Sequence, residues 1–183
     1  FLFSENVPSL FLVSDNPDVQ GREWVEESQD KSNKATGRMV LLKEDGTLVH
    51  QGVLTQIKGR GNSTWIGKKK PYQIKTDTKV DLLHTGNSEN KKKTWVLLAN
   101  YLDLSLMNNS IALGLGEAMG METNIENTHI DLYYDGQYRG SYLLSAKVEV
   151  GKGRVNITDL EGKKEEENDG TEREELPRGN STT

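Results

Sequence analysis

The stretch from residue 58 to residue 75, KGRGNSTWIGKKKPYQIK, constrains the fold most, because it joins a glycine-rich turn directly to a strand. Gly59 and Gly61 permit backbone conformations that other residues resist, and they let a ligand come close to the backbone. The closing residues, PYQIK, alternate as a strand does and place Tyr72 and Ile74 on one face. The chain is therefore expected to fold with a tight turn that leads into a sheet.

This turn has the composition of an anion site. Arg60, three consecutive lysines and Lys75 surround a turn with free backbone N–H groups, which suits a phosphate. Two familiar phosphate loops do not match. The P-loop has four residues between its glycines, whereas five separate Gly61 from Gly67, and the dinucleotide fingerprint requires a glycine where Thr64 stands. Two interpretations stay open, an anion site and a tight turn beside solvated lysines.

The composition excludes several classes of protein. The 183 residues suffice for one domain with a core. No apolar run approaches the roughly 20 residues of a membrane helix, so no membrane span is predicted. The chain has no cysteine, which excludes disulfides and zinc–thiolate sites. Eight acidic and four basic residues follow position 160, so most of the net charge of −5 lies there. The remaining body is nearly neutral, which argues against a nucleic-acid partner.

Short apolar or alternating segments predict a sheet with one long helix. Strands are expected over residues 7–13, 38–42, 48–57, 72–75, 95–99, 129–134 and 137–145. The last two flank Asp135-Gly136, a strong hairpin signal. Asp103 is the expected N-cap of a helix from Leu104 to about Met119. The stripe expected to be buried on that helix consists of Leu104, Met107, Ile111, Leu115 and Ala118. The predicted fold class is α+β, a mostly antiparallel sheet with one long helix.

The chain divides into residues 1–160, the expected folded portion, and residues 161–183. The second segment is acidic, of low complexity and without aromatic residues, so we expect a disordered tail or linker there. The chain begins with Phe1 and shows no signal peptide, and we interpret it as a piece of a longer protein.

Several candidate residues have plainer interpretations. Trp65 can stack on a base or sugar, but a loop tryptophan more often caps a core. Asn100 and Asp103 suit a turn and a helix cap better than ligand contacts. The three histidines share no metal-ligand spacing, so no metal site is predicted within this chain.

Segments far apart in the chain share a pattern of sequence and spacing. They are GRGNSTW at 59–65, KKPYQIK at 69–75, WVLLANY at 95–101 with Asp103, DLY at 131–133, GQYRGSYLL at 136–144 and VEVG at 148–151. With this order and spacing, residues 7–160 resemble the CotH kinase family, named for a bacterial spore-coat protein. The resemblance implies the N-terminal lobe of an atypical protein kinase. Such kinases transfer phosphate from ATP, with a divalent metal such as Mg²⁺, to Ser or Thr of surface or coat proteins.

The resemblance also implies roles for individual residues. Arg60, with Asn62 and Ser63 in the same loop, would lie over the ATP phosphates. Lys70 would neutralise them, with Lys75 as the second choice. Residues 142–150, which include Glu149, would run near the adenine. A position at the cell surface, outside the cell or in the spore coat is implied as well, while the oligomeric state stays open.

Three departures from the family pattern matter. The family's Arg-Asn at the helix start is Asn108-Asn109 here, and its usual glutamate before Lys147 is Ala146. The family's metal-binding and catalytic acids lie further downstream, so no catalytic residue is assignable in this chain. We therefore expect the chain alone to lack kinase activity.

Two other functions compete with this one. A non-catalytic cell-surface or adhesion module could keep the fold without phosphate transfer, which the two lost charged residues favour. A single-stranded nucleic-acid binder could use Trp65 and Tyr72 as stacking platforms.

Overall fold

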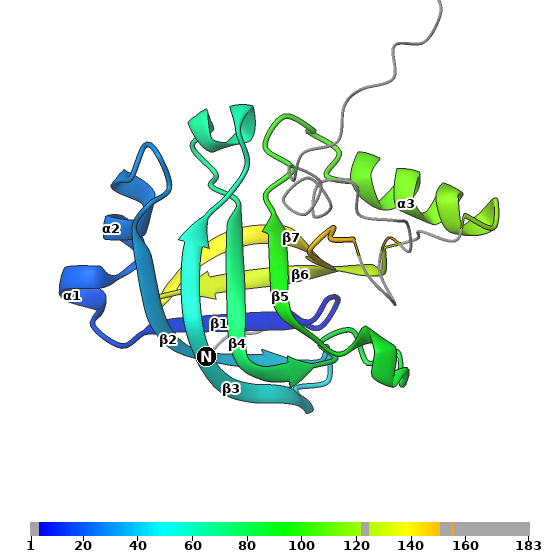
Figure 1. Cartoon of the computed structure of the whole chain (residues 1–183), viewed down its shortest axis with the longest axis horizontal. Coiled ribbons are helices and arrows are strands. Elements are labelled where there is room, and N and C mark those ends of the chain that lie inside the picture. Colours follow the sequence, from blue (N-terminus) through cyan, green and yellow to red (C-terminus); the bar gives the residue numbers. More distant parts are fainter. Residues whose placement is uncertain (1–3, 122–124, 151–154, 156–183) are drawn as a thin grey trace, which may run out of the picture.

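A closed barrel of seven strands forms the body of the protein (Figure 1). The computed structural model describes residues 4–121, 125–150 and 155. The strands are β1 (Ser9–Ser14), β2 (Lys34–Leu42), β3 (Leu48–Gly59), β4 (Tyr72–Val80), β5 (Lys92–Leu98), β6 (Asn127–Tyr134) and β7 (Gln137–Ala146). Their connections hold the helices α1 (Pro17–Gln20), α2 (Arg22–Glu27) and α3 (Asn108–Ala118), and the 3₁₀ helices η1 (Ser63–Ile66) and η2 (Ser88–Asn90).

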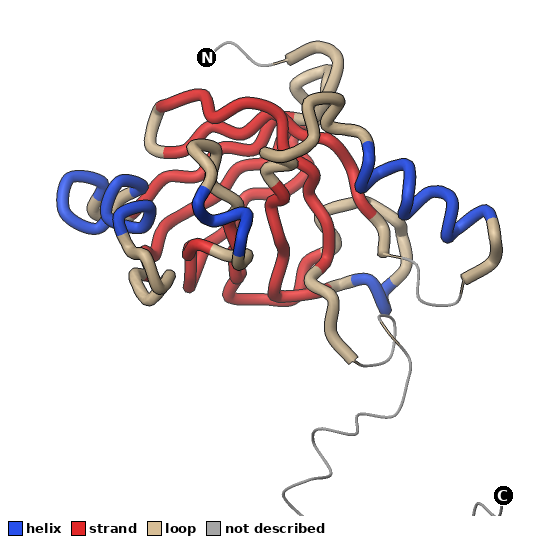
Figure 2. Tube along the Cα trace, turned by 90° about the horizontal axis from the view of Figure 1, so that it is seen from above, coloured by secondary structure: helices blue, strands red, loops and turns tan. Residues whose placement is uncertain are grey.

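The barrel closes through one parallel pair of strands. Around the barrel the order is β1-β2-β3-β4-β5-β7-β6, with antiparallel neighbours until β6 meets β1. There Leu10 lies opposite Leu132 and Leu12 opposite Tyr134. Figure 2 shows the strands wrapping around a common centre, with helices outside them. The predicted fold class, an α+β sheet with one long helix, is therefore wrong, because the strands close into a barrel. The closing pair joins strands that are far apart in the chain, and local sequence does not reveal such a pairing.

Inward-facing side chains from every strand fill the barrel. Alternation is clearest in β2, where Ala35, Met39 and Leu41 are buried between more exposed neighbours. The largest fully buried side chains are Trp95, Tyr72, Tyr134, Tyr142, Leu10, Leu12, Met39, Leu41, Leu54, Ile57, Ile74 and Leu97. Burying each of these contributes about 1.5–3 kcal/mol, so the interior of the barrel is the main source of stability.

Helix α2 packs against one end of this core and brings a carboxylate into it. Val25 is fully buried in the core. The Glu26 carboxylate accepts hydrogen bonds from Arg22 at 2.7 Å, from Arg139 at 3.2 Å and from the Tyr72 hydroxyl. The acid therefore ties α2 to β4 and β7, with both guanidinium groups as its counter-charges.

The expected long helix is shorter and less buried than its apolar spacing suggests. Helix α3 starts at Asn108 instead of Leu104, and it buries no residue. Leu104 is fully exposed, and Ile111 and Leu115 are also exposed, so the predicted buried stripe is wrong. The barrel already encloses its own core, which leaves α3 on the outside (Figure 2).

The hairpin prediction is confirmed. Asp135 and Gly136 join β6 to β7 with φ angles of 49° and 78°, as a two-residue turn with two left-handed positions requires. No helix among the described residues is long and apolar enough to cross a membrane. The predicted tail, residues 161–183, lies outside the described residues.

Candidate functional site

The loop between β3 and β4 is closed at its base. The Arg60 backbone N–H donates to the Pro71 carbonyl at 3.2 Å, which joins the two ends of the loop. Gly61 has a φ of +83°, and a Cβ at this position would lie 2.2 Å from the Thr64 hydroxyl oxygen. The left-handed backbone therefore favours glycine here, and a Cβ would also displace the Thr64 hydroxyl. The turn that the sequence predicts is present, and it directs the chain into η1.

Trp65 anchors this loop to the body of the protein. Its side chain is only 5 % exposed, and its indole N–H donates to the Ser28 carbonyl at 2.9 Å. The Lys70 ammonium lies 4.9 Å from the centre of the indole ring. Trp65 therefore caps a core, and Tyr72 is fully buried. Neither ring presents a face on which a nucleic-acid base could stack.

A second segment, residues 99–109, faces this loop at the top of the barrel (Figure 1). Asn100 has a φ of 48°, its amide N–H donates to the Leu106 carbonyl at 2.9 Å, and its oxygen accepts from the Asn109 amide at 2.7 Å. The Asp103 carboxylate accepts from Ser105 and from the backbone N–H of Asn108. These bonds lower the pKa of Asp103, with the Ser105 hydroxyl as the largest cause. Asn100 and Asp103 thus shape the turn before α3.

The two segments enclose a cavity of about 280 Å³. Its lining residues are Arg60, Thr64, Pro71, Leu98, Ala99, Asn100, Tyr101, Leu102, Asp103, Asn108 and Asn109. Arg60 is partly buried, and burial lowers the pKa of its guanidinium, which nonetheless stays charged because an arginine pKa is so high. Among the described residues the Arg60 guanidinium has no ion-pair or hydrogen-bond partner. The cavity therefore presents an unpaired cation beside hydroxyl and amide groups.

The other predicted site residues lie outside the cavity lining. Asn62 and Ser63 are exposed where the loop enters η1. The Lys70 ammonium donates to the Trp65 carbonyl at 2.6 Å, so it is already engaged by the loop. Lys75 is exposed on β4, opposite Gln56 and Thr94. Glu149 forms an ion pair with Lys147 at 3.0 Å.

Lys58 shares a face of the sheet with two of the predicted residues. In β3 and β4 the side chains of Ile57 and Ile74 point into the core, so Lys58, Arg60 and Lys75 lie on the outer face. Lys58 pairs with Gln73, two positions along the ladder from the row that holds Lys75. Sequence reasoning recognised Arg60 and Lys75, but it missed Thr64 and Tyr101 as cavity walls because the cavity forms between two separate loops.

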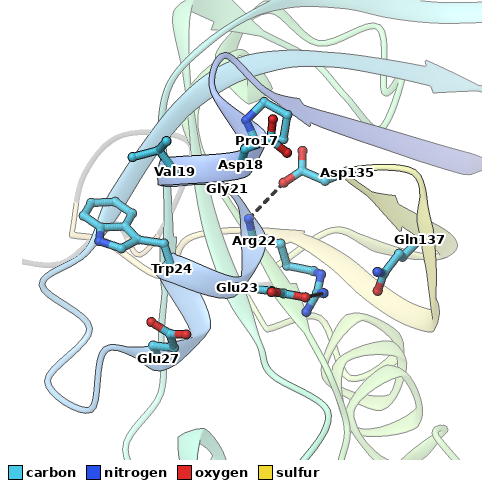
Figure 3. Close-up of a pocket in the computed structure, with 10 residues that line it drawn as sticks. All are labelled: Pro17, Asp18, Val19, Gly21, Arg22, Glu23, Trp24, Glu27, Asp135 and Gln137. Carbon is cyan, nitrogen blue, oxygen red and sulfur yellow. Dashed lines mark hydrogen bonds and ion pairs between the residues drawn. The ribbon is translucent and has the colours of Figure 1, made fainter.

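A different cavity, of about 420 Å³, lies beside α1 and α2 (Figure 3). There the Asp135 carboxylate accepts from the backbone N–H groups of Arg22 at 2.8 Å and Ser14 at 2.7 Å. The Arg22 guanidinium is paired with Glu23 and Glu26. Backbone N–H groups thus engage Asp135, two glutamates engage the Arg22 guanidinium, and no residue predicted for the site lines this cavity.

The cavity with Arg60 suits a phosphate better than a metal ion. Asp103 is its one carboxylate, and that group is already bonded to Ser105 and Asn108. Within the described parts of the chain, no group of three or more His, Cys, Asp or Glu side chains could hold a metal. These residues do not form a Mg²⁺ site by themselves, whereas a cation beside amide donors fits a phosphate group.

Comparison with known proteins agrees with the sequence pattern. A search of curated proteins gave no significant match. A family model described as CotH kinase protein matches residues 57–169, which include the Arg60 loop, α3 and the β6–β7 hairpin. The matched region exceeds half of the chain, and we conclude that this protein belongs to the CotH kinase family.

Proposed function

We propose that the cavity between residues 60–71 and 99–109 receives phosphate groups of ATP. In this proposal the chain supplies the phosphate-covering part of a CotH-type kinase that transfers phosphate to Ser or Thr of coat or surface proteins. Phosphoryl transfer depends mainly on positioning and on stabilising negative charge. An arginine beside a nucleotide provides both, because its planar group can bond two phosphate oxygens at once.

The unpaired guanidinium of Arg60 carries this proposal. Buried cations are normally paired, since removing a charge from water without a partner is costly. Arg22 and Arg139 follow this rule, because both pair with Glu26. Arg60 is also partly buried, which lowers the pKa of its guanidinium. It nevertheless has no acidic partner among the described residues. A bound phosphate would supply the missing negative charge.

ATP would bring its own Mg²⁺ to this site, and the metal would neutralise developing charge on the phosphates. The residues of this chain would bind and orient the anion: Arg60 by its charge, and Thr64 and Asn109 by their polar side chains in the same cavity. Lys75 and Lys58, on the outer face of the adjoining strands, would extend the positive surface. We also propose a location at the cell surface, outside the cell or in a spore coat, which rests on membership of the family.

A second candidate is a non-catalytic surface module that keeps this fold. One structural observation favours it: the Lys70 ammonium, expected to neutralise phosphate, is bonded to the Trp65 carbonyl. The replacement of family charges by Asn108 and Ala146 points the same way. In this case the chain would bind no nucleotide at millimolar concentration.

Titration calorimetry of the full chain with ATP and Mg²⁺ tests the first candidate. We expect binding at millimolar affinity or better, weakened about 10- to 100-fold by Arg60→Ala, because bonds to a charged group contribute about 1.5–3 kcal/mol. Arg38→Ala is the matched control, since it removes the same charge from an exposed position on β2. Binding that survives Arg60→Ala would refute this site, and no binding by the unaltered chain would favour the second candidate.

A further inference from the structure

An aromatic ring forms a contact between the two walls of the Arg60 cavity. Tyr101 belongs to the wall formed by residues 99–109, and its ring lies against Gly67, at the end of η1 in the opposite wall. A Cβ at Gly67 would lie 2.4 Å from Cδ1 of Tyr101 and 2.7 Å from Cγ. Real Cβ atoms do not approach a ring so closely, so the contact requires glycine at this position.

Gly67 is needed for space and not for its backbone conformation. Its φ of −63° and ψ of 154° are extended values that any residue adopts. An alanine at position 67 would therefore be unstrained were it not for the ring of Tyr101. This makes Gly67→Ala a clean way to push the ring away without disturbing the turn itself.

The ring of Tyr101, and not its hydroxyl, makes the contact. The side chain is partly exposed, and its hydroxyl has no hydrogen-bond partner among the described residues. The backbone behind it is held firmly, because Asn100 is bonded to both Leu106 and Asn109. Phenylalanine should therefore replace tyrosine at this position without loss.

The opposite wall is fastened to another part of the protein at Trp65, and a hydrogen bond within the wall closes its turn. Trp65 fastens it to Ser28, and the N–H of Gly67 donates to the Thr64 carbonyl at 3.4 Å. Gly67 follows η1 on this wall, and Tyr101 lies beside Asn100 on the other, so their contact bears on the distance between η1 and the opposite wall. Arg60 and Thr64 line the cavity on the side of η1, and Asn100 and Asn109 line it on the other side.

We propose that Tyr101 is a positioning residue that sets the width of the Arg60 cavity through its contact with Gly67. This inference rests on the anion-binding role proposed above. It assigns no phosphate contact to the Tyr101 hydroxyl. The ring acts through Arg60 by keeping the two loops at a fixed separation.

Titration of the full chain with inorganic tripolyphosphate tests the proposal. We expect Tyr101→Ala and Gly67→Ala each to weaken binding about tenfold, since small displacements of a binding group are costly. Tyr101→Phe should bind as the unaltered chain does. Gly67→Ala should have no further effect in a Tyr101→Ala background, because the ring it would displace is gone. If the Tyr101 and Gly67 variants all bind as the unaltered chain does while Arg60→Ala binds more weakly, the positioning role is overturned and the proposed function stays intact.

Hydrogen exchange of the unbound chain tests the contact between Tyr101 and Gly67 separately from anion binding. Loss of the ring should speed exchange at the Gly67 N–H several-fold in Tyr101→Ala but not in Tyr101→Phe, while the paired Trp95 N–H stays unchanged. Unchanged exchange at Gly67 in Tyr101→Ala would overturn the contact itself. If the unaltered chain binds no tripolyphosphate, the proposed function fails and the positioning role fails with it, whatever the exchange shows.

Discussion

The indole ring of Trp65 lies directly over the Cα of Gly59, so that a Cβ at Gly59 would stand 2.3 Å from Cη2 of the ring. Gly59 ends β3, and Trp65 sits in η1 after the turn. The contact folds the glycine-rich loop back onto its own strand. This contact explains why Gly59 is needed, because the absence of a side chain at Gly59 makes room for the Trp65 ring. Gly61 has a different role, since its backbone is left-handed.

We therefore expect Gly59→Ala to destabilise the protein by about 1–3 kcal/mol, the usual cost of overpacking a core. Urea unfolding followed by tryptophan fluorescence measures the change. Gly114→Ala is the control, because a Cβ there meets nothing within 4 Å and the residue lies inside α3. Alanine in a helix should leave stability equal or slightly higher. A Gly59→Ala variant as stable as the unaltered chain would contradict the packing described here.

The carboxylates of Glu26 and Glu23 both pair with Arg22, but their surroundings differ. Glu26 is largely buried and also bonds Arg139 and Tyr72, whereas the Glu23 side chain is 78 % exposed. Glu26→Gln should cost about 2–3 kcal/mol, because it leaves two guanidinium groups without their shared counter-charge. Glu23→Gln should cost less than about 1 kcal/mol, as exposed pairs do. Chemical unfolding of both variants measures the difference, and equal losses would show that α2 is not held through Glu26.

Stability should fall at alkaline pH because of the buried tyrosines. Burial raises the pKa of Tyr72, Tyr134 and Tyr142, and burial with a hydrogen bond to Asp131 raises that of Tyr138 to about 12. The neutral phenols therefore stabilise the fold fully below pH about 10, where unfolded tyrosine titrates. This stabilisation is lost as the pH rises through 12 and beyond.

Absorbance at the phenolate band, recorded together with circular dichroism, measures this effect. We expect part of the tyrosine absorbance to change only when the dichroism of the folded barrel is lost. The Tyr138→Phe variant should lack a step near pH 12 that precedes unfolding. If all six tyrosines titrate near pH 10 while the fold persists, the three buried rings are not enclosed as described.

Local chemistry was sufficient to predict several parts of this protein. Asp135 and Gly136 form the predicted hairpin, since few other residues accept left-handed conformations in a two-residue turn. Arg60 and the glycines around it indicated a turn with a cation, and the separated motifs indicated the CotH family, which the family match confirms. Each of these depends on residues close together in the chain or on a pattern of spacing.

The sequence by itself determined the turns, most of the strands and the cation of the candidate site. Only the tertiary structure decided that β1 closes a barrel against β6, because a strand's partner depends on long-range packing. Closure of the barrel also explains why Ile111 and Leu115 are exposed. A barrel that encloses its own core leaves no interior place for α3, so the apolar spacing of this helix did not lead to burial. In the same way, Tyr101 contacts Gly67 because two loops that are separate in the sequence lie at the same end of the barrel. Tertiary structure also decided that the Lys70 ammonium donates a hydrogen bond to the Trp65 carbonyl.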